Sequence, residues 1–95
     1  MKKYIYIQCF EREICTPEIF DTHEQAMLAM HKDFLENLDE SDIEYELENE
    51  GVDLRNITKC LLSWIGCGDF DFAPDIAWVN GRQGNWDARI CEIEV

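Results

Sequence analysis

Positive charge is scarce in this chain. Only eight of the 95 residues are Lys or Arg, against 21 Asp or Glu, so the net charge is −13 at pH 7. Nucleic acids and anionic lipids are bound mainly through Lys and Arg side chains. We therefore expect no direct binding of nucleic acid and no membrane association. The partners that this charge favours are cationic: a basic protein surface or a metal cation.

Motifs for catalysis and cofactor binding are also missing. The five Cys and two His show neither a Cys-x-x-Cys pair nor the paired His spacing of zinc sites. Residues 69–75 resemble a calcium loop only superficially, because Phe70 and Phe72 interrupt it and no glycine makes the sharp turn. We expect both Phe side chains to pack in the core. The sequence predicts no catalytic residue, no metal site and no cofactor, and a small Cys/His enzyme is the less favoured alternative.

The cysteines are odd in number and not closely paired, which disfavours a disulfide scaffold. They are Cys9, Cys15, Cys60, Cys67 and Cys91. The apolar N-terminal stretch is interrupted at Gln8, too early for a secretory signal, and no window is long enough to span a membrane. The sequence therefore predicts five free thiols and a cytoplasmic protein.

The composition is that of a folded domain. Apolar residues make up 46% of the chain and aromatic residues 12%, which argues against disorder in spite of the charge. A chain of 95 residues has room for one hydrophobic core. We expect a single domain over residues 1–95.

Two strands are expected near the N-terminus. Residues 3–10 alternate β-branched and aromatic side chains, which is typical of a strand. Residues 14–20 can pair back onto it, but Pro17 restricts this second strand to a sheet edge or cuts it short.

A hairpin is expected near the C-terminus. Residues 76–79 and 86–95 have strand character, and the Asn-Gly pair at 80–81 begins a turn between them. The apolar alternation of the last strand changes phase near Cys91 and Glu92, which predicts a bulge or an end-of-sheet change there.

Helix signals fill the middle of the chain. Thr22 and Gln25 have the spacing of a capping box, and apolar residues then recur at helical intervals, which predicts a helix over 22–38. His23, in its first turn, is expected to make a cap contact, and His31 to pack at the margin of its apolar face. Asp53 is expected to cap a further helix. The apolar stripe of that helix comprises Leu54, Ile57, Leu61, Trp64 and Ile65.

Residues 41–50 are ambiguous between helix and strand. Ser41 and Glu44 form a second capping-box pattern, and Gly51 suits a helix C-terminus. However, apolar and acidic residues alternate strictly through this stretch, which is the period of a half-buried strand. We favour a short helix because both ends carry cap signals, and expect an exposed acidic face in either case.

Together these elements predict an α+β fold. The expected architecture is a small antiparallel sheet of about four strands, built from the first and last segments of the chain and covered by two or three helices.

The strongest functional signal is an uncompensated acidic run. Residues 33–54 contain ten carboxylates and no Lys or Arg. Such a run is often only a solvated surface, but its charge also suits it to compete with nucleic acid for a basic groove. The expected partner-binding residues are Asp39, Glu40, Asp42, Glu44, Glu46, Glu48, Glu50 and Trp86. Trp86 is included because it lies beside a turn, where we expect partial exposure together with Arg82 and Arg89; a tryptophan that covers the sheet edge is the alternative.

In size, charge and this acidic run, the chain resembles the small acidic anti-defence proteins of phages and mobile elements. These include the anti-CRISPR and antirestriction nucleic-acid mimics. The resemblance implies a non-catalytic inhibitor that occupies the basic groove of a nuclease or a nucleic-acid-binding complex. The alternative is an immunity protein that neutralises a cationic toxin, where acidic patches also steer association.

Overall fold

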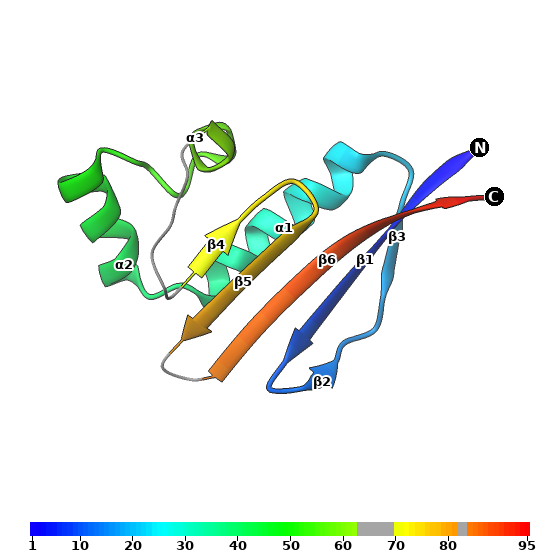
Figure 1. Ribbon diagram of the computed structural model, residues 1–95, viewed down its shortest axis with the longest axis horizontal. Coiled ribbons are helices and arrows are strands. Elements are labelled where there is room, and N and C mark those ends of the chain that lie inside the picture. The colour runs from blue at the N-terminus through cyan, green and yellow to red at the C-terminus, as the bar shows by residue number, and fades with distance from the viewer. Residues whose placement is uncertain (63–69, 82–83) are drawn as a thin grey trace.

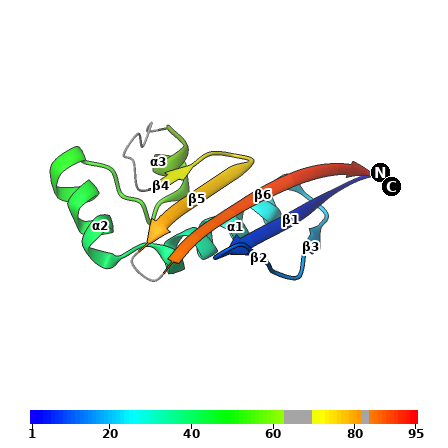
Figure 2. The same cartoon turned by 60° about the horizontal axis from the view of Figure 1, so that its bottom comes forward.

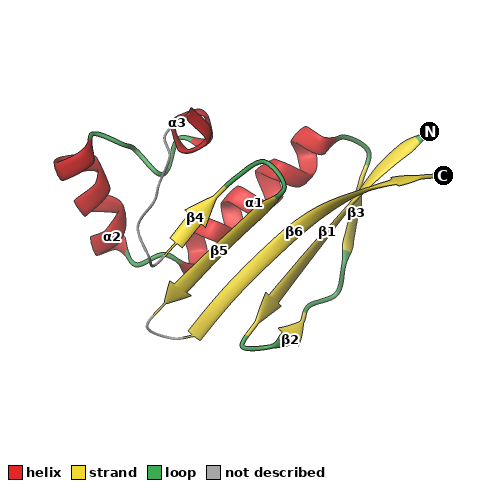
Figure 3. Cartoon of the chain, viewed as in Figure 1, coloured by secondary structure: helices red, strands yellow, loops and turns green. Residues whose placement is uncertain are grey.

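The computed structural model describes residues 1–62, 70–81 and 84–95, and its strands form one antiparallel sheet. The strands are β1 (Lys2–Phe10), β2 (Glu13–Ile14), β3 (Glu18–Phe20), β4 (Phe70–Phe72), β5 (Ile76–Gly81) and β6 (Gly84–Glu94). Their order is β2-β1-β6-β5-β4, and β3 also pairs with β1. The helices are α1 (His23–Asn37), α2 (Glu40–Tyr45), the π-helical η1 (Glu46–Glu50) and α3 (Ile57–Leu62). The α+β class is thus confirmed (Figure 3).

The sheet is larger than expected, with six strands among the described residues. One reason is that residues 13–20 form two short strands, β2 and β3, on either side of Pro17, and both pair with β1. The other is β4, which was expected only to place its Phe side chains in the core. Phe70 and Phe72 are indeed buried, and β4 places them there as an added edge strand beside β5.

The two long strands β1 and β6 form the centre of the sheet. Their pairing runs without interruption from Lys2 opposite Glu94 to Phe10 opposite Trp86, so the predicted bulge near Cys91 is wrong. The change of apolar phase marks a change of face: Ile90 points into the core, whereas Ile93 lies on the opposite side of the sheet.

Helix α1 covers one side of this sheet, and the predicted helix is confirmed. The hydroxyl of Thr22 accepts a hydrogen bond from the backbone N–H of Gln25 at 3.1 Å, as the capping box requires. Ala26, Met30 and Phe34 are fully buried. The Phe34 ring lies 5.1 Å from that of Phe72 and 6.5 Å from that of Trp86, which places α1 against the sheet (Figure 1).

Because strand residues alternate in direction, the sheet has two unlike sides. We call the side packed on α1 the core face; it carries the buried residues of each strand, such as Tyr6, Ala77 and Ala88. We call the opposite side the open face. Its strand residues are Lys3, Ile5, Ile7, Cys9, Ile14, Ile19, Asp71, Ile76, Trp78, Asn80, Asn85, Asp87, Arg89, Cys91 and Ile93.

The N-cap predicted for α3 is wrong. Helix α3 begins at Ile57, and Asn56 caps it by accepting hydrogen bonds from the N–H groups of Thr58 and Lys59. Asp53 instead closes a turn by accepting from the N–H of Arg55. Trp64 and Ile65, the end of the predicted apolar stripe, lie outside the described residues.

The expectation for His23, in the first turn of α1, is also wrong. The cap contact expected of His23 is absent, because its Nε2 lies 2.7 Å from Asp75 Oδ1 and links α1 to the β4–β5 turn. His31, by contrast, is buried as expected. No helix in the described part of the chain has both the length and the apolar character needed to cross a membrane.

Candidate functional site

The acidic run forms a helical segment at one end of the molecule. We call residues 40–50, which form α2 and continue directly into η1, the acidic segment. Figures 1 and 2 place α2 at the end of the molecule opposite the two chain termini. The preference for helix is confirmed, although Asp39 rather than Ser41 is the N-cap. Gly51 ends the segment with φ of 70°, a left-handed conformation that glycine adopts without strain.

Helical geometry separates the alternating acids into two rows. Residues two apart on a helix differ by about 200°, whereas residues four apart lie on the same side, about 6 Å along the axis. Glu40, Glu44 and Glu48 therefore form one row, and all three are exposed. The other row, Asp42, Glu46 and Glu50, faces partly toward the body of the molecule.

Glu46 does not contribute to the exposed surface, which corrects the prediction for this residue. Only 8% of it is exposed. It turns inward because the second row lies on the side of the helix that also buries Ile43. Burial raises the pKa of the Glu46 carboxyl, and the neighbouring charges of Glu50 and Asp42 raise it further.

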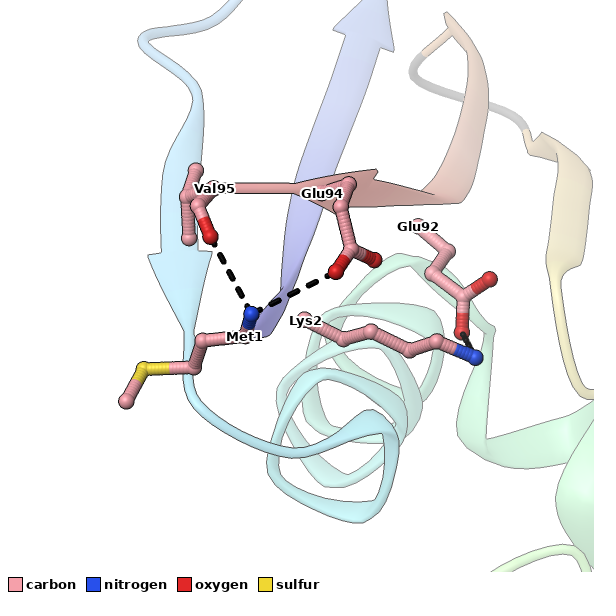
Figure 4. A network of polar contacts seen from close by, with 5 residues as sticks. All are labelled: Met1, Lys2, Glu92, Glu94 and Val95. Carbon is pink, nitrogen blue, oxygen red and sulfur yellow. Dashed lines mark hydrogen bonds and ion pairs between the residues drawn. The ribbon is translucent and has the colours of Figure 1, made fainter.

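The exposed carboxylates of the segment form no ion pairs with described cations. The ion pairs found among the described residues join the N-terminal amine to Glu94, Lys2 to Glu92, Lys3 to Asp21 and His23 to Asp75. Two of them lie where the chain ends meet, as Figure 4 shows. The negative charge of the acidic segment is thus left for solvent or a partner.

The density of this charge is close to that of a nucleic acid strand. Five carboxylates other than Glu46 are distributed over the eleven residues of the segment. At ~1.5 Å per residue this corresponds to roughly one charge per 3 Å. One strand of duplex DNA carries one charge per ~3.4 Å of axis.

Two large apolar side chains stand among these carboxylates. Tyr45 is 59% exposed and Leu47 is 44% exposed. The sequence pattern did not single them out, because their alternation with Ile43 is also that of a buried strand face. Once the segment is helical, the three residues diverge and only Ile43 is buried. Exposed aromatic residues of this kind are typical anchors of protein interfaces.

A buried polar cluster holds the loop that follows the acidic segment. His31 Nε2 lies 2.9 Å from the carbonyl oxygen of Leu54, and Cys60 Sγ donates to the same oxygen at 3.0 Å. Because a carbonyl can only accept, Nε2 must carry a proton. The cluster therefore ties α1, the 51–56 loop and α3 together beside the acidic segment.

The Cys60–His31 pair lacks the features of an activated nucleophile. The Sγ–Nε2 distance is 3.8 Å, and a protonated Nε2 has no lone pair with which to take the thiol proton. Burial raises the pKa of Cys60 to about 11, with a further contribution from the negative charge of Asp53. Reactive cysteines have lowered pKa values and are partly exposed. The geometry of this pair is therefore not that of an activated Cys/His nucleophile.

Trp86 is buried, and the expectation of partial exposure is wrong. Only 2% of the residue is exposed, and its Nε1 donates to Gln8 Oε1 at 3.0 Å. It lies on the core face in phase with Ala88 and Ile90. Arg82, expected beside it, lies outside the described residues.

Cys9, Cys15, Cys60 and Cys91 are free thiols, and Cys67 lies outside the described residues. Within residues 1–62, 70–81 and 84–95, no group of His, Cys, Asp and Glu side chains is arranged to hold a metal ion. Comparison of the chain with protein-family models, with curated proteins and with solved structures gave no match.

The burial of Glu46 leads to a testable prediction about stability. Because its pKa is higher in the folded state than in the unfolded state, its charged form destabilises the fold at neutral pH. We expect Glu46→Gln to raise the free energy of unfolding at pH 7, by an amount on the order of 1 kcal/mol. The gain should shrink as the pH falls through the raised pKa and vanish below the unfolded value of 4.5.

Urea denaturation at a series of pH values measures this difference. The matched control is Glu44→Gln, which removes the same charge from an exposed position of the same helical segment. An equal effect of both substitutions would show that general repulsion, not burial, is responsible.

Proposed function

We propose that this protein is a cytoplasmic, non-catalytic inhibitor that binds a basic protein surface. In this proposal the acidic segment occupies the nucleic-acid-binding groove of a nuclease or nucleic-acid-binding complex and acts as a nucleic-acid mimic. The observation that carries the proposal is the acidic segment itself: a protruding helical unit whose exposed carboxylates form no ion pairs with described cations.

The electrostatics of the segment suit this role in two ways. Its charge spacing is close to that of a nucleic acid strand, so a groove lined by Lys and Arg would attract both. In addition, none of the described ion pairs involves a carboxylate of the segment, so its negative field is not reduced by a direct ion pair with a described cation. Such a field raises the rate of encounter with a basic partner.

Charge alone does not hold a specific complex together. Tyr45 and Leu47 provide apolar surface between the carboxylates, and burial of such side chains slows dissociation. The segment also packs against the body of the protein, because Ile43 is buried in the main core cluster together with Leu38 and Leu54. We therefore expect it to bind as a preformed helix.

The proposal is tested by capturing partners from host lysate and then competing with DNA. The wild-type protein and a double variant, Glu44→Lys with Glu48→Lys, serve as baits at low and at high salt. We expect the wild type to retain a nucleic-acid-binding protein that the double variant loses, and the captured protein to release DNA when the wild type is added. A captured protein that binds DNA equally well in its presence would contradict mimicry. Capture of a cationic toxin would favour the immunity-protein alternative.

Tyr45 is expected to contribute to affinity without contributing to the fold. Because 59% of it is exposed in the free protein, Tyr45→Ala should change the unfolding free energy by at most about 0.5 kcal/mol. It should weaken partner binding by roughly 30-fold, as truncation of an interface anchor does, with the loss mainly in the dissociation rate. Surface plasmon resonance separates the two rates. Leu28→Ala, at an exposed position on α1, is the control that should leave binding unchanged.

A further inference from the structure

The open face of the sheet carries many apolar residues, and none of the described elements covers it. Among the helices, α1 packs on β1, β5 and β6 from the core face. In Figure 1 the viewer looks onto the other side, with α1 behind the strands. Ile14, Ile19 and Ile76 are 74%, 64% and 39% exposed on this side. Half-buried Ile5, Ile7 and Cys9 of β1 join Ile14 and Ile19 in one apolar strip, and half-buried Trp78 joins Ile76 in a second strip on β5. Asp87 and Arg89 of β6 lie between the two strips. Exposed apolar residues that gather on one face, with charged residues among them, are typical of an interaction surface.

The charge of this face differs from that of the rest of the protein. Its strand residues include two cations, Lys3 and Arg89, and two anions, Asp71 and Asp87. The face is therefore neutral, whereas the chain as a whole has a net charge of −13. A basic partner would be attracted to the acidic segment, not here. A second copy of the same chain can approach through this face without bringing two strongly negative surfaces together.

The size of the face is close to that of a dimer interface. β1 and β6 pair over nine residues, which at ~3.4 Å per residue is about 30 Å. Four neighbouring strands spaced ~4.8 Å apart span roughly 19 Å. The flat area of the face is thus about 600 Å², and the protruding side chains increase the accessible surface beyond this value. A standard protein interface buries about 800 Å² on each partner.

The face also has a hollow into which side chains of a partner can insert. It has a volume of about 260 Å³ and is lined by Cys9, Arg12, Trp78, Asn80, Asn85, Trp86 and Asp87. Apart from Arg12 and Trp86, these residues belong to the open face. Two sheets that pack face to face lie about 10 Å apart, and their side chains interdigitate. A hollow on one sheet can accept side chains of the other.

We propose that a second copy of this chain covers the open face and that the protein is a two-fold symmetric dimer. The two sheets pack face to face, as in a β-sandwich, and the interface uses the same surface of each copy. The acidic segments are not part of this interface. They remain free for a basic partner, and the dimer presents two of them.

The test is the molar mass in solution as a function of concentration, measured by sedimentation equilibrium. We expect a monomer–dimer equilibrium with a Kd on the order of 1 µM. Ile7→Lys and Ile76→Lys should each weaken it by at least about tenfold, because each would bury an unpaired charge. Leu28→Lys is the matched control, since Leu28 is 51% exposed but lies on α1. Circular dichroism checks folding, and Ile76→Thr replaces Ile76→Lys if the lysine variant does not fold.

A second readout follows the thiol of Cys91, which is exposed on the open face opposite Ile5. Its labelling by a maleimide should be slowed above the Kd and return to the monomer rate on dilution. A protein that is monomeric at every concentration, with unchanging labelling of Cys91, would overturn the proposal. A dimer that persists in both Ile7→Lys and Ile76→Lys would also overturn it, because the interface would then lie elsewhere.

The effect of salt concentration distinguishes the dimer proposal from the proposed function. Dimerisation brings two negative chains together, so added salt should strengthen it by screening their repulsion, whereas it should weaken binding to a basic partner. The double variant Glu44→Lys with Glu48→Lys should remain dimeric. Either proposal can therefore fail while the other stands.

Discussion

Reversing Glu44 and Glu48 to lysine is expected to slow association with the basic partner by roughly 10- to 100-fold. Both side chains belong to the exposed row of the acidic segment, and neither forms an ion pair with a described cation. Their charge therefore acts on the partner through solvent, where it steers the encounter. Stopped-flow or surface plasmon resonance measurements at several salt concentrations give the association rate.

The matched control for this variant is Glu13→Lys with Glu18→Lys. Both control residues are exposed on the short strands β2 and β3, and the net charge changes by the same amount. We expect the control to change the association rate by no more than about threefold, since the effect of distant charges is screened. Equal slowing by both variants would mean that net charge alone drives binding. If the Glu44→Lys, Glu48→Lys variant does not slow association, the acidic segment is only a solvated surface.

The elements that the sequence predicted well are those with several agreeing signals. For α1, a capping box, a helical apolar period and a clean apolar face all indicate the same helix, and the structure confirms it from His23 to Asn37. For β1, alternation and β-branched composition agree in the same way. Local and tertiary preferences coincide in these segments, so neighbouring sequence is enough to define them.

The acidic segment could be predicted only in part, because its two signals conflict. Its acids alternate with apolar residues as in a strand, while Gly51 indicates a helix end. The helical outcome places Tyr45 and Glu46 opposite to what alternation predicts: Tyr45 is exposed and Glu46 is buried. Which side of a helix faces the body is a tertiary property, set in this segment by the burial of Ile43, and the local pattern does not contain it.

Trp86 shows how a turn can mislead. Its position two residues after Gly84 indicated exposure, yet the same sequence also placed it in phase with Ala88 and Ile90. The phase was the better signal, because β6 begins at Gly84 and is already paired with both β1 and β5 at Trp86. A strand that is paired on both sides from its first residues can bury one face there, as β6 does from Trp86 to Ile90.

Trp86→Ala is expected to lower the free energy of unfolding by about 3–5 kcal/mol. Only 2% of the residue is exposed, and its ring centroid lies 6.5 Å from that of Phe34, so truncation leaves a cavity between α1 and the sheet. It also removes the donor that satisfies Gln8 Oε1. Small domains have a total stability of about 5–15 kcal/mol, so a large share would be lost. Urea denaturation measures the loss.

The consequence for binding experiments is that loss of partner binding in Trp86→Ala would report unfolding, not a lost contact. Trp86→Phe is the matched control, because it keeps an aromatic ring and removes the indole N–H; we expect it to cost less than the alanine variant and to leave binding by the folded protein intact. Tyr45→Ala should show the reverse pattern, with binding weakened and stability kept. If Trp86→Ala instead retained wild-type stability and still lost the partner, the indole would have to leave the core in the complex, and recognition would involve the C-terminal hairpin rather than the acidic segment alone.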